Sequence, residues 1–421
     1  MSYKNLLNNL WQETTEEGIN YKSLQEEVKT DLVIIGGGYT GCSAALFASK
    51  SGLSTTLIDQ KIGYGGSGRN VGLVNAGLWM PPKKVESLIG LNAGSKLNNA
   101  LASSPDLVFS IIQNYDIKCQ SQRKGTLHCA HSQKGLKDLQ LRFKQLSERG
   151  AKLKLLDKKM THQRIGSSQF FGALYNENAG TINPLAYCQG LARAAQLIGA
   201  NIYESTRAIS IRSTNNFWIV KTPEGSIKAK KLLVATNAYQ TSISGLDLSS
   251  YTPVNYFQVA TQPLSSNELS TILPNHEGCW DTASVMSSFR LDAQDRLIMG
   301  GIGNLSHSAS KIHIHWAKRK IKALFPQLDN TSIEYSWHGS IAMTADHIPK
   351  ILKIGKNAYS IFGYSGRGIG PGTYFGKAIS ESLVSGDESS LPIDPINHYD
   401  ESFSGIKGNL IELGATARHL L

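Results

Sequence analysis

"DLVIIGGGYTGCSAALFASKSGLSTTLIDQ", residues 31–60, joins two apolar runs through a cluster of glycines. An apolar run that stops at glycine is typical of a buried parallel strand. The small and apolar residues of 40–52 suit a helix packed tightly on a sheet, and Gly52 can end that helix. "STTLIDQ" (54–60) predicts the next strand. The stretch therefore predicts a βαβ unit that binds a nucleotide.

Three glycines of this unit, Gly36, Gly38 and Gly41, form the pattern GxGxxG. The first turns the chain out of the strand, the second lets backbone approach a pyrophosphate, and the third allows close helix–strand packing. Asp59 ends the second strand, where a carboxylate can hold ribose hydroxyls. An acid at this place argues against NADP and leaves both NAD and FAD open.

The composition bounds the class of protein. The chain has 421 residues, 41% of them hydrophobic and 18% charged, which suits a globular protein of two interleaved domains. No apolar run reaches the roughly 20 residues of a membrane-spanning helix, and the first residues do not resemble a secretory signal. The five cysteines are odd in number and lack CxxC spacing, which predicts reduced thiols in a cytoplasmic protein.

Residues 118–164 are strongly basic, with thirteen Lys or Arg against three acids. The apolar residues of 134–149 repeat at helical spacing, so part of the charge is expected on the exposed face of a helix. Attraction to an acidic partner, to a membrane surface or to RNA is the alternative. Aromatic residues do not alternate with these charges, which argues against RNA.

Two further glycine-rich segments favour FAD over NAD. "GGSGRNVGLVNAG" (65–77) follows the second strand, and its Ser67, Arg69 and Asn70 can donate hydrogen bonds to the inner phosphate and ribityl oxygens. "GYSGRGIGPG" (363–372) opens the last predicted helix. The N-terminus of that helix would stabilise the negative charge that develops on a flavin during reduction.

These nucleotide-binding features lie at both ends and in the middle of the chain, which predicts a discontinuous domain. We expect an α/β fold with a Rossmann-type FAD-binding domain from residues 28–92, 150–250 and 340–400. An inserted α+β substrate domain with a mixed sheet would take 93–149 and 251–339, and 1–27 and 401–421 would be terminal extensions.

The same segments resemble the D-amino acid oxidase-like superfamily of flavoproteins. The resemblance spans about residues 28–390 and is best with the γ-glutamylputrescine oxidase-like branch; "LLVATNAY" (232–239) and "RLIMGG" (296–301) contribute to it. It implies FAD, a substrate domain over the isoalloxazine, and oxidation of a C–N bond by hydride transfer to flavin N5.

The resemblance also implies which residues bind FAD. The ADP half would contact the three fingerprint glycines and Asp59, and the remaining cofactor-binding positions are Ser67, Arg69, Asn70, Gly72, Ala235, Thr236, Asn237, Gly366, Arg367, Gly368, Ile369 and Gly370.

The chain departs from the superfamily in two places. Many of its amino-acid oxidases clamp the substrate carboxylate with an arginine, and Ile341 stands where that arginine would be. Either the substrate is an amine without this carboxylate, or another cation such as Arg290 or Arg367 binds it. No cysteine matches the position of covalent flavin attachment in sarcosine oxidases, so we expect non-covalent FAD.

Four substrate-side candidates are expected to face the flavin: Tyr256, Arg290, His338 and Arg367. Tyr256 would cover the substrate, and His338 would hydrogen-bond the amine. Positioning can supply most of the catalysis, so no single essential base is expected. His313 and His315 form HxH without a carboxylate or cysteine nearby in sequence, which predicts no metal site.

The sequence therefore predicts an FAD-dependent oxidoreductase that converts an amine or amino acid (γ-glutamylputrescine-like, N-substituted or D-configured) to an imine. The electron acceptor would be oxygen or a quinone, and a quinone would make the basic segment a peripheral membrane contact. One alternative is an oxidase or dehydrogenase of a cyclic imino acid such as L-pipecolate or proline. An RNA-associated flavin domain acting on modified tRNA is the alternative from another class.

Overall fold

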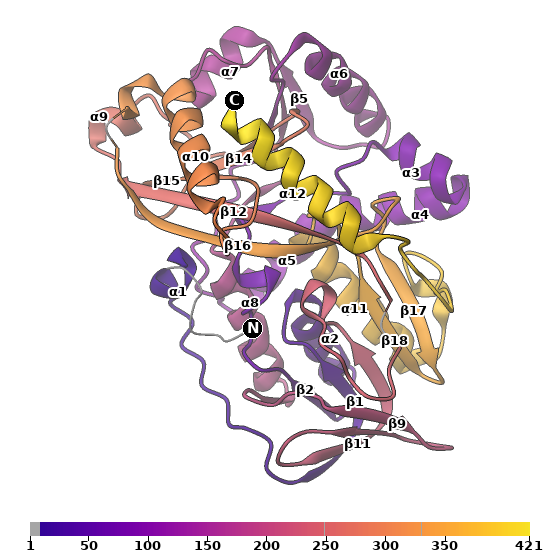
Figure 1. The fold of residues 1–421 in the computed structure, drawn as a ribbon. Coiled ribbons are helices and arrows are strands. Elements are labelled where there is room, and N and C mark those ends of the chain that lie inside the picture. The colour runs from indigo at the N-terminus through magenta and orange to yellow at the C-terminus, as the bar shows by residue number, and fades with distance from the viewer. Residues whose placement is uncertain (1–8, 248, 330) are drawn as a thin grey trace.

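The computed structural model describes residues 9–247, 249–329 and 331–421. Their strands form two eight-stranded sheets and a two-stranded sheet of β3 (Leu73–Val74) and β7 (Gly180–Thr181). Figure 1 shows the first sheet in the lower half of the molecule and the second in the upper half. This arrangement confirms the predicted α/β fold with a nucleotide-binding domain and a second, mixed-sheet domain.

The first sheet has the predicted βαβ unit at its centre. Its strand order is β17–β18–β11–β1–β2–β8, with β10 and then β9 branching from β11. The strands from β18 to β8 pair in parallel, whereas β17, β10 and β9 pair antiparallel. The bounds are β1 Glu27–Ile35, β2 Thr55–Ile58, β8 Asn201–Tyr203, β9 Ser210–Ser213, β10 Trp218–Lys221, β11 Ser226–Val234, β17 Lys350–Gly355 and β18 Ala358–Phe362.

Both faces of β1 are buried, which explains its unbroken apolar run. Ile34 points into the large core that includes α2 (Tyr39–Lys50), α8 (Pro184–Leu197) and α11 (Ile369–Ser385), while Val33 and Ile35 point into a second core. Small residues let α2 and α11 approach closely, since a Cβ on Gly376 would lie only 2.4 Å from the carbonyl oxygen of Thr40.

The second sheet is predominantly antiparallel, in the order β16–β12–β15–β14–β13–β4–β6–β5. Its outer face packs on a core that includes α10 (Ser310–Leu324) and α7 (Lys158–Ile165), and its inner face meets the first domain. The bounds are β4 Thr126–Cys129, β5 Leu153–Leu156, β6 Ala173–Asn176, β12 Thr252–Pro263, β13 Gly278–Asp281, β14 Ser287–Leu291, β15 Arg296–Ile302 and β16 Ile333–Met343.

The structure differs from the expected domain boundaries in two places. β5 and β6, expected in the FAD-binding domain, pair with each other and with β4 in the second sheet. Conversely, α4 (Leu91–Ala102) and α5 (Ser104–Asn114), expected in the substrate domain, bury their apolar residues in the core of the first. Apolar periodicity indicates that an element buries one face, but it does not indicate against which sheet.

The remaining helices lie mainly at the periphery. α6 and α7 account for much of the basic segment, and Arg142, Arg149 and Arg164 in it form ion pairs with Asp138, Glu86 and Glu277. The other bounds are α1 Leu10–Thr14, α3 Pro82–Ile89, α6 Gln133–Ser147 and α9 Ser266–Leu269. Among the described helices, none has the length and apolar character needed to cross a bilayer.

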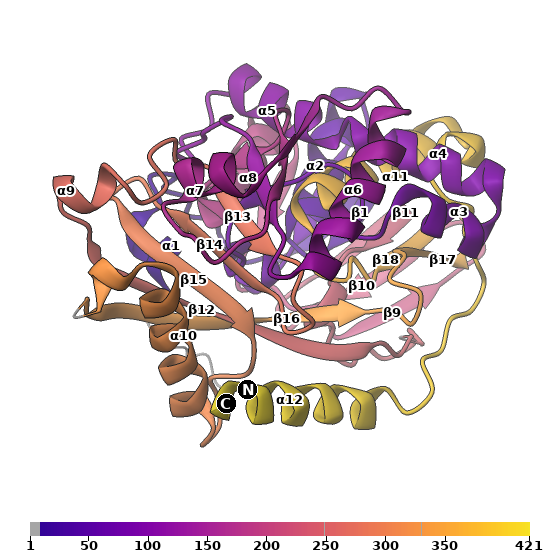
Figure 2. The same cartoon turned by 90° about the horizontal axis from the view of Figure 1, so that it is seen from above.

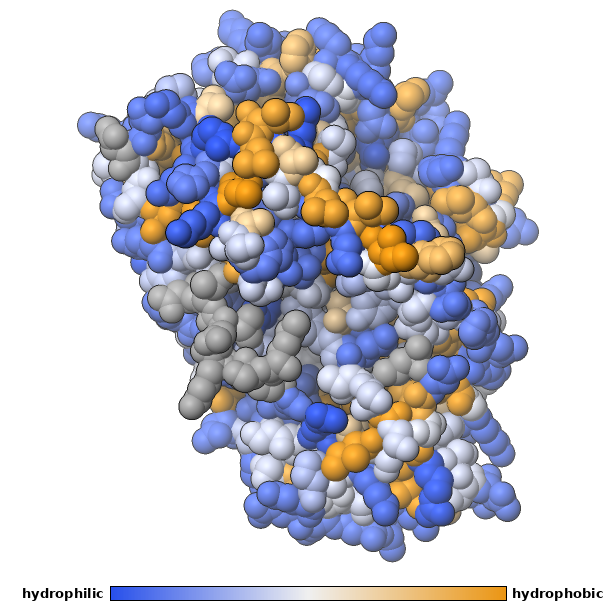
Figure 3. Space-filling model, viewed as in Figure 1, coloured by the Kyte–Doolittle hydropathy of each residue, from blue (hydrophilic) through white to orange (hydrophobic). Residues whose placement is uncertain are grey.

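α12 (Ser404–Leu420) is a well-formed helix in the segment that the sequence predicted only as an extension. Figure 2 shows it along the outside of the molecule, near α10 and below β16. Its inner side is close to β12, since a Cβ on Gly408 would lie 2.6 Å from the carbonyl oxygen of Pro253. Its outer side exposes an apolar ridge, visible in Figure 3, made by Phe403, Ile406, Leu410, Leu413 and Leu420.

Candidate active site

The turn between β1 and α2 is shaped so that it accepts only glycine. Gly36 has a φ of +110°, and a Cβ there would lie 2.8 Å from the backbone of Ala235. A Cβ on Gly41 would lie 1.8 Å from the carbonyl oxygen of Gly36. α2 then begins at Tyr39, and its N-cap residue Gly38 has no capping side chain. The turn and helix N-terminus together form a cradle suited to a pyrophosphate.

Asp59 lies where the motif predicts it, at the end of β2 beside this turn. Its carboxylate accepts hydrogen bonds from the amides of Gly37 and Gln60, both at 2.5 Å. Burial raises the pKa of this carboxyl group, while the amide hydrogen bonds act in the opposite direction. Asp59 therefore braces the glycine turn and stands beside the phosphate cradle.

The loop at 65–77 is held by its own polar side chains. The Oγ of Ser67 accepts from the amide of Tyr39 (3.1 Å), which ties the loop to the start of α2. Asn70 donates from Nδ2 to the carbonyl of Gly66 (2.9 Å) and accepts at Oδ1 from the amide of Gly72 (2.8 Å). These bonds give the loop one conformation beside the cradle.

Arg69 links the loop to the second sheet. It is nearly fully buried and donates from Nε to the carbonyl of Tyr64 (2.7 Å) and from Nη1 to the carbonyl of His338 (3.1 Å). Its own carbonyl accepts from Nε1 of Trp337 (3.0 Å). The resemblance gave Arg69 a place along FAD, and the structure shows that its side chain fixes the loop.

Ala235, Thr236 and Asn237 follow β11 directly and lie against the glycine turn. The amide of Ala235 donates to the carbonyl of Ile35 (2.8 Å), which extends the parallel pairing of β1 and β11. Asn237 adopts a left-handed conformation and accepts at Oδ1 from the amide of Gly363 (3.0 Å). Residues 235–237 and the last glycine loop are therefore joined by a hydrogen bond.

The last glycine loop begins α11, as the sequence predicts. Gly366 has a φ of +91°, and Gly368 is an N-cap without a capping side chain. A Cβ on Gly370 would lie 2.5 Å from Oγ of Ser104, so α5 closes on this helix start. The loop thus presents free helix-terminal amides toward the interior.

Arg367 of this loop is directed at the second sheet. Its guanidinium lies 5.1 Å above the ring of Trp280 and donates to the carbonyl of Ala76 (3.2 Å). Burial, followed by the charge of Arg142, lowers its pKa to about 9. Among the described residues it has no ion-pair partner, so a half-buried cation faces this region without a counter-charge.

The inner face of the second sheet presents one row of residues toward the loops. The register places six residues in this row, one per strand: His128, Trp280, Ser288, Gly300, Gln258 and Trp337. The imidazole of His128 stacks on Trp280 with ring centroids 4.8 Å apart. Burial, followed by nearby arginines, holds its pKa well below the usual value, so it is neutral.

Tyr256 lies on the same inner face, two residues before Gln258. Its hydroxyl donates to Oγ of Ser288 (2.9 Å), and burial raises its pKa, so it stays protonated. Trp280 and Gln258 were missed from the sequence, because only the register of β12 and β13 reveals that they share this face with Tyr256.

Two expected substrate-side residues have other surroundings. Arg290 donates to the carbonyls of Ile182 (3.0 Å) and Gly72 (3.3 Å) and lies 5.2 Å from the ring of Trp11. Its guanidinium therefore holds the ends of the two-stranded sheet together. His338 pairs with Phe257 on β12 and points to the outer face, away from Trp337 and the row.

The residues present fit an FAD. A Cβ on Gly36 or Gly41 would collide with the backbone that shapes the turn. Two buried polar atoms on the inner face, Oε1 of Gln258 and Nε of Arg290, have no partner among the described residues. Buried polar atoms of this kind are normally satisfied by a ligand or water. The five cysteines are buried, and Cys279 pairs with Phe289 on the outer face, so it points away from the row.

Comparison with known proteins agrees with this site. The family model "DAO: FAD dependent oxidoreductase" matches residues 31–382. "Probable oxidoreductase OrdL" of Rhizobium meliloti is 30% identical over 369 residues, 87% of this chain and 85% of that protein. Gamma-glutamylputrescine oxidoreductase of Escherichia coli is 29% identical over 383 residues, 90% and 89% respectively. The crystal structure of L-proline dehydrogenase from P. horikoshii has a TM-score of 0.72 at 21% identity, covering 87% of this chain and 97% of that one, and shares the fold.

Proposed function

We propose that this chain, which belongs to the DAO family of FAD-dependent oxidoreductases, oxidises an amine that carries no carboxylate on the reacting carbon. It is an FAD-dependent oxidoreductase of amines or amino acids. The proposed substrate class is a γ-glutamylputrescine-like amine, in line with the relative of that name. The cofactor is proposed to be held without a covalent bond.

Ile341 is the observation that carries the substrate class. It stands where many amino-acid oxidases of the D-amino acid oxidase-like superfamily have the arginine that binds the substrate carboxylate. It pairs with Val254 on β12, so it shares the inner face with Trp337, and its Cδ1 would lie 3.8 Å from a Cβ on Gly366. An aliphatic side chain beside the flavin-edge loop favours an uncharged part of a substrate over a carboxylate.

The inner face would orient such a substrate. Trp280 and Tyr256 offer aromatic surface, and the hydroxyl of Tyr256 donates its proton to Ser288. Neutral His128 adds no charge to the wall, so a neutral amine is favoured over its ammonium form. A bound FAD would supply the hydride acceptor for oxidation of the carbon that carries the amine, and the imine product would hydrolyse in water. The residues therefore contribute positioning and exclusion of water.

A second candidate, oxidation of a cyclic imino acid such as L-proline, is favoured by Arg367. This half-buried guanidinium has no ion pair among the described residues and lies against Trp280. It would bind the α-carboxylate in place of the missing clamp, as arginine commonly does. The solved L-proline dehydrogenase has the same fold, which alone does not decide the substrate.

Anaerobic mixing of the purified holoprotein with a substrate panel tests both candidates. The panel contains γ-glutamylputrescine, putrescine, sarcosine, D-alanine and L-proline, and flavin absorbance is followed. We expect γ-glutamylputrescine to bleach the flavin fastest and D-alanine to leave it oxidised. Bleaching by D-alanine alone would overturn the amine proposal, and bleaching by L-proline alone would replace it with the second candidate. Readmission of air then shows whether oxygen reoxidises the flavin.

A further inference from the structure

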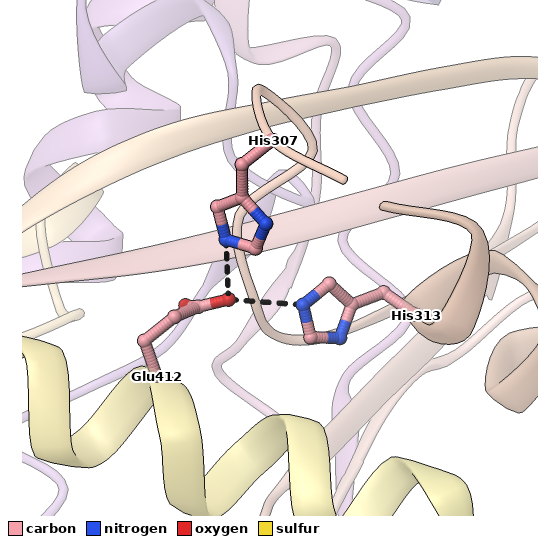
Figure 4. A group of neighbouring side chains, drawn as sticks. All are labelled: His307, His313 and Glu412. Atoms are coloured by element: carbon pink, nitrogen blue, oxygen red, sulfur yellow. Dashed lines mark hydrogen bonds and ion pairs between the residues drawn. The ribbon is translucent and has the colours of Figure 1, made fainter. Parts of the chain in front are cut away.

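A cluster of metal-binding side chains lies on the outer face of the second sheet, opposite the FAD side. His307 comes from the segment before α10, His313 from the first turn of α10, and Glu412 from the middle of α12 (Figure 4). Oε1 of Glu412 is 2.9 Å from Nε2 of His313 and 3.2 Å from Nε2 of His307. One ligand atom from each residue lies within 4.8 Å of the others.

The surroundings of His313 are built to hold its ring in this orientation. The ring is fully buried, and a Cβ on Gly303 would lie 2.8 Å from it, so the backbone passes directly against the imidazole. Its Nδ1 is 2.8 Å from Nδ1 of His419, whose ring stacks on Trp316 with centroids 4.1 Å apart. His419 is itself fully buried and belongs to the last turn of α12.

A backbone amide also holds the carboxylate of Glu412 in place. The amide of Asn304 donates to Oε1 of Glu412 (3.0 Å), so three donors converge on one carboxylate oxygen. Convergence of two imidazoles on one carboxylate, with outer partners for His313 and Glu412, is the donor set that zinc sites use.

We propose that His307, His313 and Glu412 bind a divalent transition metal such as Zn²⁺, which fastens α12 to α10 and to the segment before it. The metal takes the place of the two protons that the Nε2 atoms share with Glu412. Two nitrogens and one oxygen leave a fourth position for water. The side chain of His307 is 38% exposed, so water can reach this position. The HxH motif predicted no metal site because its partners are supplied by residues distant in sequence.

Metal binding requires the ring protons of both histidines to lie on Nδ1. With a metal on Nε2, Nδ1 of His313 carries the ring proton and donates a hydrogen bond to Nδ1 of His419. This bond fixes the tautomer of His313. Nδ1 of His307 accepts from the amide of Ala309 (3.1 Å) in the metal-free form. When a metal binds Nε2, the proton that this nitrogen carried moves to Nδ1, and the exposed ring turns so that the amide of Ala309 is left to water.

The site is separate from the flavin chemistry. His313 and His419 contact Phe257, whose side chain points away from the inner-face row that contains its neighbour Gln258. Zn²⁺ has no redox chemistry, so its expected role is to stabilise the attachment of α12. Failure of the amine proposal would leave this site unaffected.

Titration of the chelator-treated holoprotein with Zn²⁺ against a chromogenic chelator tests the proposal. We expect one saturable equivalent per chain, and affinity weakened by roughly tenfold or more in His307→Ala and in Glu412→Gln. His315→Ala is the matched control, since His315 is an exposed histidine of the same helix outside the cluster, and it should bind as the wild type does. The flavin spectrum of each variant checks that the fold is retained.

Hydrogen exchange gives a second readout. Zn²⁺ is expected to slow exchange of the α12 amides in the wild type and in His315→Ala, and to leave it unchanged in Glu412→Gln. The absence of a saturable equivalent, or equal affinity in all four proteins, would overturn the proposal and leave the cluster as a hydrogen-bonded network. His307 is partly exposed, so its substitution by alanine tests the ligand without opening the core.

Discussion

The indole Nε1–H of Trp337 donates to the carbonyl oxygen of Arg69 at 3.0 Å, across 268 positions of sequence. Nε2 of Gln258 donates to the same oxygen at 3.4 Å, and Nη1 of Arg69 donates back to the carbonyl of His338. These bonds fasten the loop of the nucleotide-binding domain to two strands of the second sheet. The position of the loop beside the flavin therefore depends on both domains.

Replacing Trp337 with phenylalanine should weaken FAD retention and lower the free energy of unfolding by about 2 kcal/mol, because a buried carbonyl loses a donor. FAD dissociation and urea unfolding measure the two effects. Trp218→Phe is the control, since Nε1 of Trp218 donates to the carbonyl of Lys356 (3.1 Å) in the first sheet. It should lose stability without faster FAD release. Equal FAD release from both variants would contradict the coupling.

Gly41→Ala should yield a protein without bound FAD. Its Cβ would lie 1.8 Å from the carbonyl oxygen of Gly36, so either the turn or α2 has to move. The ratio of flavin to protein absorbance measures occupancy. Gly414→Ala, in α12, meets nothing within 4 Å, should keep its FAD, and should gain up to about 1 kcal/mol of stability from helix propensity. Full FAD occupancy in Gly41→Ala would show that the turn is not the phosphate cradle.

Ile341→Arg should shift specificity toward substrates with a carboxylate on the reacting carbon. A charge-assisted hydrogen bond of about 1.5–3 kcal/mol corresponds to a change of roughly tenfold to a hundredfold in the ratio of kcat/KM values. The ratio for D-alanine and γ-glutamylputrescine measures it. Ile341→Leu keeps the volume without the charge and should leave the ratio near that of the wild type. An unchanged ratio in Ile341→Arg would place substrate binding elsewhere.

Acid should destabilise the protein partly through His338. Burial, followed by the charge of Arg69, lowers its pKa from 6.5 to about 4 in the folded state. Between these values the unfolded chain binds more protons, so stability is full above pH 6.5 and falls as pH decreases toward 4. The slope from one group is at most about 1.4 kcal/mol per pH unit, and partial exposure of the ring reduces it.

Urea unfolding in the presence of a chelator, from about pH 7 to about pH 5, measures this slope. His338→Asn should flatten the dependence. His315→Asn, on the exposed side of α10, should retain it. A slope unchanged by His338→Asn would assign the acid sensitivity to other groups.

Features that depend on neighbours in sequence could be predicted. The strand, the glycine turn, the helix start and Asp59 occupy one stretch, so their spacing alone defines the phosphate cradle. The second helix start at Gly368 was likewise visible from its local glycines. In both cases the backbone conformation that requires glycine is set by residues a few positions away.

Features that depend on register between distant strands could not be predicted. His338 and Trp337 are adjacent in sequence, yet they face opposite sides of β16, and only the pairing with Phe257 and Gln258 decides which side meets the flavin. The partner of His313 was missed for the same reason, since Glu412 is 99 positions away. Trp11, in a segment expected to be a terminal extension, is fully buried and donates to the carbonyl of Asn70.

The row from His128 to Trp337 draws one residue from each of six strands, and Cys279 and Phe257, the sequence neighbours of Trp280 and Gln258, belong to the separate outer core. A substitution at His128, Trp280 or Ser288 leaves the outer core intact, whereas a Cβ on Gly300 would lie 2.7 Å from the ring of Tyr256. A small combinatorial library confined to His128, Trp280 and Ser288 would therefore explore new amine specificities while leaving the bonds from Gln258 and Trp337 to Arg69 in place.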